Sequence, residues 1–223
     1  MSRKNGPSII TNGLVLYLDA ANKQSYMSGS TSWIDVSNNN NNGTLINGPI
    51  FNTGSLGSIV FDGIDDYVLV SNSSNFTVSE MTIGAWFTSK KDVRNYITTK
   101  LNDSWYVGIG PGGTTSGKLS LFVEGTTGGW LQGPTTINQN QWYYGVCTFK
   151  SNISSIYVNG TLDISATRTG TMPNGTASIY VGHRPDDSSY FWGNIAQTQI
   201  YNRALSASEV LQNYNATKAR FGL

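Results

Sequence analysis

The chain has 223 residues, and its 14 Lys and Arg residues against 13 Asp and Glu residues leave a formal net charge of +1. This charge is too small to attract a polyanion along its length, so nucleic acid is excluded as an expected partner. No apolar run approaches the roughly 20 residues that span a bilayer, and residues 1–7 lack a secretory signal's apolar stretch, so we expect no membrane insertion and synthesis in the cytoplasm.

Short segments rich in β-branched and aromatic residues alternate with clusters of Gly, Asn, Asp and Ser, a pattern typical of an all-β protein. In chain order, strands are predicted at 14–19, 44–46, 58–61, 67–70, 81–88, 95–99, 105–109, 118–123, 142–149, 155–158, 161–164, 178–182 and 193–201. About a dozen strands are enough for two stacked sheets in one domain. The predicted fold class is therefore an all-β, two-sheet antiparallel β-sandwich with one short C-terminal helix.

A tight hairpin is predicted around Asn159-Gly160, because this pair supplies the two positive-φ positions of a type I′ turn. Side chains alternate along a strand, so Ile156 and Val158 are expected on one face and Tyr157 on the other. One face of this hairpin should therefore be buried.

Three polar segments are predicted as loops. The run of five Asn residues at 38–42 buries no apolar surface and is expected to be exposed. The Gly-rich segments 110–117 and 125–129 have the composition of turns and loops.

The single helix is predicted near the C-terminus. Ser206 and Glu209 have the spacing of a capping box, and Leu205 can pack onto Val210 as a hydrophobic staple. The helix is expected to end near Thr217 and to pack across an edge or an end of a sheet.

Three groups of segments resemble the laminin-G-like jelly-roll family of the concanavalin A-like lectin and glucanase superfamily. They are N-G-L-V-L-Y-L-D-A at 12–20 with W-I-D-V-S at 33–37 and N-G-T at 42–44, then I-V-F-D-G-I-D-D-Y-V at 59–68, and finally Y-V-G at 180–182, G-N-I at 193–195 and I-Y-N-R-A-L-S at 200–206. Each segment alone is a weak signal, whereas all of them in the order of the family identify the fold.

The resemblance implies a laminin-G-like, concanavalin A-like β-sandwich domain over residues 12–223, preceded by an N-terminal arm at 1–11. It implies little about activity, because this fold carries lectins, glycosidases, adhesion modules and capsid-associated domains. The segments G-L-V-L-Y-L-D-A-A-N-K at 13–23 and Y-N-A-T-K-A-R-F-G-L at 214–223 also resemble virion proteins of tailed bacteriophages.

We therefore hypothesise a non-enzymatic structural protein of the bacteriophage virion surface. It would be a capsid decoration, fibre or adhesin subunit that attaches to other virion proteins through its arm and binds cell-surface glycans weakly. It would be made in the host cytoplasm without a signal peptide. A free carbohydrate-binding module or lectin is the alternative, and a glycosidase is a remote one; the sequence is compatible with a homo-oligomer or a monomer.

No catalytic residue is predicted. A retaining glycosidase needs two carboxylates about 5–5.5 Å apart, generally from alternating positions of one strand. No carboxylate lies two or four residues from Glu80, Glu124 or Glu209. The sole histidine, His183, is predicted in a loop, and the sole cysteine, Cys147, lies in an apolar strand where its thiol should be buried and inert.

Glycan binding uses aromatic faces and nearby polar groups, generally on loops at the rim of a sandwich. Most of the 6 Trp and 12 Tyr residues should be core, as expected for Trp86 and Trp142 within strands. The candidate carbohydrate-binding residues are those in loops: Trp130, Asp186, Asp187, Tyr190 and Trp192.

No cofactor is required by this hypothesis, although Ca²⁺ is a candidate ligand. Asp62, Asp65 and Asp66 are the first choice as calcium ligands, because a hard cation prefers oxygen donors, and Asp186 and Asp187 are the second. The alternative role of the first three is turn chemistry, in which their carboxylates bind free amides. One His and one Cys cannot supply a four-ligand zinc site.

Overall fold

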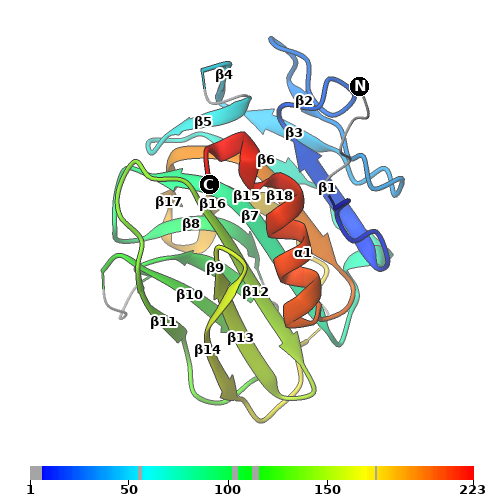
Figure 1. The fold of residues 1–223 in the computed structure, drawn as a ribbon, viewed down its shortest axis with the longest axis vertical. Coiled ribbons are helices and arrows are strands. Elements are labelled where there is room, and N and C mark those ends of the chain that lie inside the picture. The colour runs from blue at the N-terminus through cyan, green and yellow to red at the C-terminus, as the bar shows by residue number, and fades with distance from the viewer. Residues whose placement is uncertain (1–6, 55–56, 102–104, 112–115, 174) are drawn as a thin grey trace.

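Two eight-stranded antiparallel sheets pack face to face, which confirms the predicted β-sandwich (Figure 1). The computed structural model describes residues 7–54, 57–101, 105–111, 116–173 and 175–223. Sheet A has the order β14 (Thr161–Thr167), β13 (Ile153–Val158), β12 (Tyr143–Lys150), β7 (Met81–Ser89), β18 (Trp192–Tyr201), β5 (Ser58–Asp62) and β4 (Ile50–Asn52), and β1 (Leu14–Asp19) also pairs with β18.

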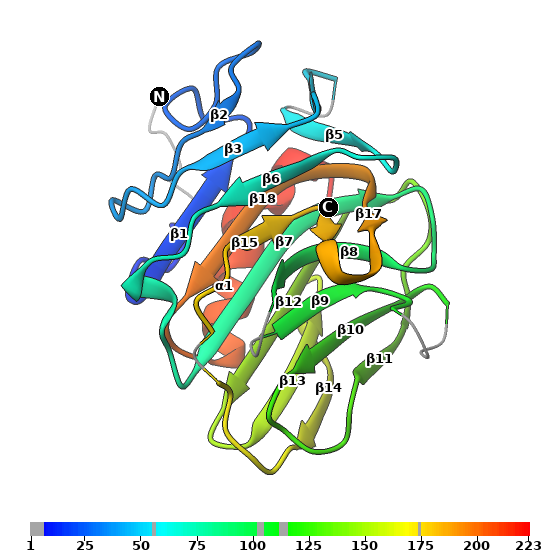
Figure 2. The same ribbon diagram turned by 180° about the vertical axis from the view of Figure 1, so that it is seen from behind.

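Sheet B covers the other side of the core and is seen in front in Figure 2. Its order is β11 (Leu131–Thr136), β10 (Lys118–Val123), β9 (Trp105–Ile109), β8 (Asn95–Lys100), β15 (Ile179–Val181), β6 (Tyr67–Val70), β3 (Gly43–Ile46) and β2 (Ser32–Trp33). A separate hairpin pairs β16 (His183–Arg184) with β17 (Ser189–Tyr190), and single 3-10 turns are formed by η1 (Ser74–Phe76), η2 (Pro185–Asp187) and η3 (Lys218–Phe221).

The main core lies between the sheets, where alternate side chains of each strand meet. Leu16 and Leu18 of β1, Phe87 of β7 and Val107 of β9 belong to this core and are at most 4% exposed. Cys147 of β12 lies in the same core, and burial raises the pKa of its thiol far above the ordinary value, as predicted for an inert cysteine.

The predicted hairpin joins β13 to β14. Asn159 and Gly160 have φ angles of 51° and 81°, the positive values that the type I′ turn requires. Ile156 and Val158 lie in the main core, and Tyr157 lies on the opposite face of sheet A, as predicted.

Helix α1 (Ala207–Thr217) lies over the outer face of sheet A rather than at an edge or an end, so its predicted placement was wrong (Figure 1). The reason is a group of stacked aromatic rings on the outer face of sheet A, which the sequence pattern did not reveal. Trp86 stacks on Tyr214 of α1 with ring centroids 5.8 Å apart and on Phe221 at 4.0 Å. Trp86 Nε1 also donates a 2.8 Å hydrogen bond to Thr217 Oγ1. Trp86 is buried as predicted, but under the helix.

The segment Y-N-R-A-L-S forms the approach to α1, and its residues stabilise the start of that helix. Ser206 Oγ accepts a hydrogen bond from the Glu209 amide (3.3 Å), and the Glu209 carboxylate accepts one from the Ser206 amide (2.8 Å), which confirms the capping box. The Arg203 guanidinium, 2.6 Å from Glu209, lowers the pKa of that carboxyl to about 2. The staple residues Leu205 and Val210 lie together in the cluster beneath the helix.

The Asn run is attached to β1, so its description as a simple exposed loop was only half right. Asn41 is 6% exposed, and its Nδ2 donates a 2.7 Å hydrogen bond to the Val15 carbonyl. Asp35 organises this loop: its carboxylate accepts hydrogen bonds from the amides of Tyr17 (2.9 Å), Ser37 (2.9 Å) and Asn41 (3.0 Å) and from the Ser37 hydroxyl (2.8 Å). The segment W-I-D-V-S thus fixes the approach to β1.

The other predicted loops agree with the structure as far as it describes them. Residues 125–129 form turns between β10 and β11, and within 110–117 the residues 112–115 lie outside the described part. The predicted arm at 1–11 is described only from residue 7 onward, and its boundary stays a prediction. No helix in the described ranges is long and apolar enough to cross a membrane.

Candidate functional site

An acidic turn joins β5 to β6 and gathers the three candidate calcium ligands. Asp62 Oδ1 accepts hydrogen bonds from the amides of Ile64 (2.8 Å) and Asp65 (3.4 Å), and Asp66 Oδ2 accepts one from the Asp62 amide (3.0 Å). One carboxylate oxygen from each of Asp62, Asp65 and Asp66 lies within 4.8 Å of the others. The turn chemistry expected for these residues is present, and the clustering that a cation needs is present with it.

Burial of Asp66 dominates the electrostatics of this acidic turn. Asp66 is 5% exposed, whereas Asp62 and Asp65 are open to solvent. Burial raises the pKa of the Asp66 carboxyl to about 6; the hydrogen bond from the Asp62 amide opposes this rise, and the two neighbouring carboxylates add to it. Three clustered carboxylates fit the oxygen-donor preference of a hard cation such as Ca²⁺.

Trp192 stands beside the acidic turn, because it pairs with Asp62 in the register of β18 and β5. A Cβ at Gly63 would lie 2.7 Å from the Trp192 Cβ, and Gly63 has a φ of 79°, so this close approach requires glycine. Trp192 is 43% exposed, with Lys90 Nζ 6.0 Å from its ring centroid. The structure thus brings a candidate sugar-stacking ring next to the candidate calcium ligands.

The sole histidine lies in a short strand, so the prediction of a loop residue was wrong. His183 is 6% exposed and stacks on Tyr190, its partner in β17, with ring centroids 4.2 Å apart. The ring centroid of Tyr67 lies 5.0 Å from that of His183, and the Ser189 carbonyl oxygen is 3.1 Å from His183 Nδ1. Burial lowers the pKa of His183. The candidate residue Tyr190 is thereby fixed by ring stacking.

Arg184 connects the candidate residues Asp186 and Asp187 to sheet B. Its guanidinium donates two 2.6 Å hydrogen bonds to Asp186 and one of 2.8 Å to the Tyr96 hydroxyl, and it lies 3.8 Å from Asp187. The central carbon of the guanidinium also lies 4.5 Å from the Tyr106 ring centroid, within the range of a cation–π contact. Asp186 and Asp187 are therefore held over the outer side of sheet B.

Trp130, in the loop before β11, also lies over the outer side of sheet B. Its ring centroid lies 5.2 Å from that of Phe122 and 6.3 Å from those of Tyr106 and Tyr96. Trp130 is half-buried, with Tyr106 between it and Arg184. A ring at residue 130 and a carboxylate at residue 186 thus belong to one surface.

The strand register explains why these rings meet. Tyr180 pairs with Thr99, Thr99 with Tyr106, and Tyr106 with Phe122, so their side chains form a row across β15, β8, β9 and β10. We call the outer surface formed by Tyr67, Tyr96, Tyr106, Phe122, Trp130 and Tyr180 the aromatic face. The covering hairpin, residues 183–190, lies against it and is visible in front of sheet B in Figure 2.

Several members of this surface were not predicted as functional residues. Arg184 was not among the candidate residues, and Tyr96 and Tyr106 were assigned only to strands. Their alternation with inward residues, such as Ile97 and Val107, is the available sequence signal. It indicates an outward aromatic side chain on each strand but does not place the strands side by side.

Residues 62–211 match the sequence profile of the family described as the concanavalin A-like lectin/glucanases superfamily. No curated protein sequence matches the chain. Among solved structures, the chain is similar to domain 4 of AbnA, an extracellular GH43 arabinanase from Geobacillus stearothermophilus, in complex with arabinotriose. The identity is 17% and the TM-score 0.69, and the match covers 90% of this chain and 98% of that one.

Two toxin structures are similar over part of their length. The binding domain of Paraclostridial Mosquitocidal Protein 1 has 18% identity and a TM-score of 0.69, with 92% of this chain and 52% of that one covered. The binding domain of Botulinum Neurotoxin DC in complex with SialylT has 16% identity and a TM-score of 0.71, with 93% and 52% covered. The chain therefore spans about half the length of these toxin domains, and the likeness is one of fold.

Proposed function

Because the chain belongs to the concanavalin A-like lectin/glucanases superfamily, we propose that it is a glycan-binding module whose site is the aromatic face with its covering hairpin. The observation that carries this proposal is a series of three contacts, from Trp130 to Tyr106, from Tyr106 to Arg184, and from Arg184 to Asp186. It sets a ring that can stack on the C–H face of a sugar near carboxylates that accept hydrogen bonds from hydroxyls. The AbnA domain in complex with arabinotriose supports the proposal by analogy of fold.

The proposal is for binding without catalysis. Glu209 is paired with Arg203 at the start of α1, and Glu80 lies 3.7 Å from Lys150. The carboxylates of the acidic turn are close together, but they project from one turn and Asp66 is buried. A glycosidase instead places two accessible carboxylates on either side of the scissile bond.

Charge favours neutral glycans over sialylated ones. Arg184 is already engaged by Asp186 and Asp187, which together carry one negative charge more than it carries positive. The next acidic side chain, Glu124, lies close enough to raise the pKa of Tyr106, although burial is the larger cause of that rise. Lys91 lies close enough to Asp187 to interact with it, so Arg184 and Lys91 face three carboxylates, and a carboxylated sugar meets no excess of positive charge on this surface.

Replacing Trp130 with alanine is expected to weaken the binding of a neutral oligosaccharide, such as arabinotriose, at least tenfold, or about 1.4 kcal/mol. Isothermal titration calorimetry measures this loss. Trp142→Ala is the matched control, because Trp142 packs on Phe221 at the opposite face of the molecule, 4.7 Å between centroids. Equal weakening by both variants, or preferential binding of sialylated glycans in a glycan array, would contradict the proposed site.

We also propose that the acidic turn binds Ca²⁺ through Asp62, Asp65 and Asp66. Since the carboxyl of Asp66 has a pKa of about 6, protons compete with the cation below that value. Calcium affinity is therefore expected to fall as the pH is lowered from 7 to 5, and to be lost in Asp65→Asn. Calorimetric titration with CaCl₂ at each pH tests this; an affinity that does not depend on pH argues against participation of Asp66.

We propose, as the finer function, a role on the surface of a bacteriophage virion, with the chain attached to other virion proteins through its N-terminal arm at residues 1–11. This rests on the resemblance of segments 13–23 and 214–223 to virion proteins. Mass spectrometry of purified particles is expected to detect the chain in a fixed ratio to the capsid protein. Its presence only in the soluble lysate would favour a free lectin instead.

A further inference from the structure

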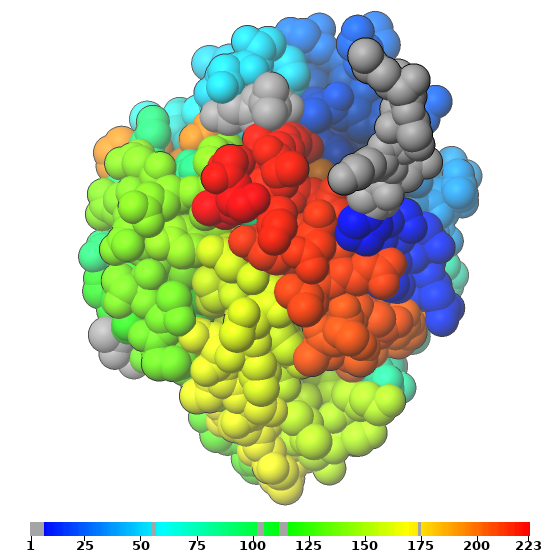
Figure 3. All heavy atoms as spheres, in the orientation of Figure 1, coloured from blue at the N-terminus to red at the C-terminus, as the bar shows by residue number. Residues whose placement is uncertain are grey.

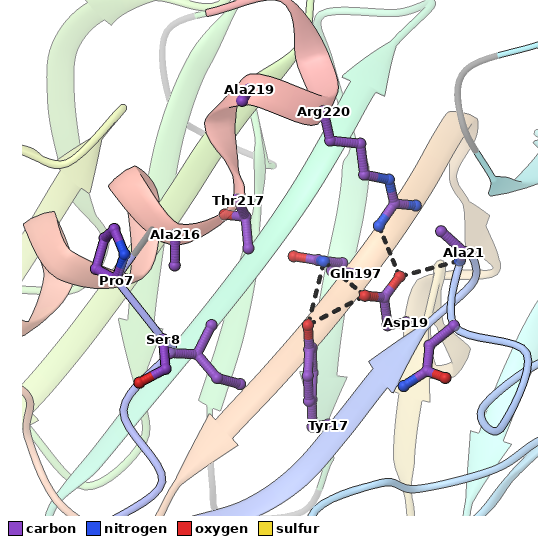
Figure 4. A pocket seen from close by; sticks show the side chains of 12 residues that line it. Pro7, Ser8, Tyr17, Asp19, Ala21, Gln197, Ala216, Thr217, Ala219 and Arg220 are labelled. Carbon is purple, nitrogen blue, oxygen red and sulfur yellow. Dashed lines mark hydrogen bonds and ion pairs between the residues drawn. The ribbon is translucent and has the colours of Figure 1, made fainter. Parts of the chain in front are cut away.

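A hollow with a volume of about 450 Å³ lies on the side of the molecule opposite the aromatic face, over the outer face of sheet A. Strands β1 and β18 form its floor, the end of α1 and η3 form one wall, and residues 7–9 form another (Figure 4). Figure 3 shows the C-terminal helix beside the N-terminal segment on this face. The hollow is separate from the aromatic face and is not used by the function proposed above.

The pairing of β1 with β18 places a network of polar side chains on the floor of this hollow. Asp19 pairs with Gln197, and Tyr17, two residues before Asp19, projects to the same side. Gln197 Nε2 donates hydrogen bonds to Asp19 Oδ2 (2.8 Å) and to the Tyr17 hydroxyl (3.2 Å), which itself donates to Asp19 Oδ2 (3.1 Å). Arg220 closes the network from η3 with a 2.6 Å ion pair to Asp19.

Two polar atoms of this network have no partner among the residues that the structure describes. They are Gln197 Oε1 and Arg220 Nε, both shielded from solvent, and Gln197 as a whole is 2% exposed. The orientation of the Gln197 amide is fixed, because Asp19 accepts hydrogen bonds only and therefore requires the NH₂ group on its side. An acceptor and a donor thus remain unsatisfied in two side chains that line the hollow.

The chemistry of the hollow selects its ligand. The charges of Asp19 and Arg220 cancel, so there is no net charge to attract an ion. Hydroxyl groups can both donate to an acceptor such as Gln197 Oε1 and accept from a donor such as Arg220 Nε. Ile9, Ala216 and Ala219 supply apolar surface for C–H groups. The volume falls within the ordinary range for small-molecule sites, about 300–1,000 Å³.

We propose that this hollow is a second binding site, specific for a neutral, hydroxyl-rich molecule of monosaccharide size, held by Gln197, Arg220 and Asp19. Burial, and next the charge of Asp19, raise the pKa of Tyr17 above its ordinary value, so its hydroxyl keeps its proton and its bond to Asp19. The protonation state of this network therefore does not change near neutral pH. Because Gln197 Oε1 and Arg220 Nε are shielded from solvent, the proposed binding requires both side chains to rotate toward the ligand.

The test uses the full chain and NMR titration with the methyl glycosides of glucose, galactose, mannose and arabinose at millimolar concentrations. At least one glycoside is expected to shift the backbone amides of Ala21 and Thr217, which line the hollow from opposite walls. Glucuronate and glucosamine, the charged counterparts, are expected to shift them at least tenfold less at equal concentration.

Ala219→Trp fills the hollow and is expected to abolish these shifts, and Ala216→Trp provides the same test from the helix if the first variant does not fold. Ala207→Trp is the matched control, because Ala207 is exposed at the first turn of α1, outside the hollow. Trp130→Ala, which tests the aromatic face, is expected to leave the shifts intact.

Two outcomes would overturn this inference. One is that no glycoside moves the amides of Ala21 and Thr217, even where binding at the aromatic face persists. The other is that Ala219→Trp and Ala207→Trp retain equal shifts. Loss of aromatic-face binding alone leaves the hollow unaffected, so the two proposals fail independently.

Discussion

Replacing Trp86 with alanine is expected to lower the free energy of unfolding by about 4 kcal/mol, within the range for removing a large buried ring. Trp86 is fully buried and is the ring on which Tyr144, Tyr214 and Phe221 stack. Its loss also leaves the Thr217 hydroxyl without the indole donor. The attachment of α1 to sheet A should weaken most.

Chemical denaturation of Trp86→Ala and Trp192→Ala measures this effect against a matched control. Trp192 is 43% exposed, so its truncation is expected to cost less than about 1 kcal/mol. Hydrogen exchange should localise the damage to the amides of α1, residues 207–217. Equal losses in the two variants would mean that the helix is held mainly by other contacts.

Replacing Asp35 with alanine is expected to cost about 3 kcal/mol, because it removes the acceptor of four hydrogen bonds at a site that is 6% exposed. The amides of Tyr17, Ser37 and Asn41 would remain partly buried without a partner. Asp35→Asn should lose about half as much, since its remaining oxygen can still accept from Tyr17 and Ser37.

The control for Asp35 is Asp65→Ala in calcium-free buffer, because Asp65 is exposed and only its backbone takes part in the hydrogen bonds of the acidic turn. Thermal unfolding followed by circular dichroism should rank the variants as Asp35→Ala, Asp35→Asn and then Asp65→Ala, from most to least destabilised. If Asp35→Ala unfolds at the same temperature as Asp65→Ala, the loop of Asn residues is held without this carboxylate.

Elements whose stabilising contacts are local in sequence could be predicted. The turn at Asn159-Gly160 depends on backbone φ values, and the capping box depends on two residues three positions apart. Both are therefore readable without knowledge of the tertiary structure. The strands themselves were predicted from short segments rich in β-branched and aromatic residues, which is also a local signal.

Contacts between distant strands could not be predicted in the same way. Asn41 looks like any other residue of a polar run, yet its side chain is buried because the Val15 carbonyl lies in reach of it. Arg184 meets Tyr96 and Tyr106 only because β16 lies against β8, and the sequence gives no register for that contact. The short edge strand β2, with two residues, is below the length at which alternation can be recognised.

The candidate site was predicted as separate parts. Trp130 and Asp186 were identified from their predicted loops, but the Arg184 guanidinium and the Tyr106 ring between them belong to strands. Trp192 and Asp62 were assigned to different ligands, whereas the register of β18 and β5 makes them neighbours. Sheet pairing is the step that turns such isolated residues into a surface.

The attachment of both ends of the described chain to α1 and sheet A has a practical consequence. The Ser8 carbonyl accepts a hydrogen bond from Gln212 Nε2, and Phe221 stacks on Trp86, so both ends lie on the side of the sandwich away from the aromatic face. A biotin or surface tag added after Leu223 would hold the molecule on this side, with sheet B directed toward the analyte. Whatever scaffold carries the protein by its ends would display that sheet outward in the same orientation.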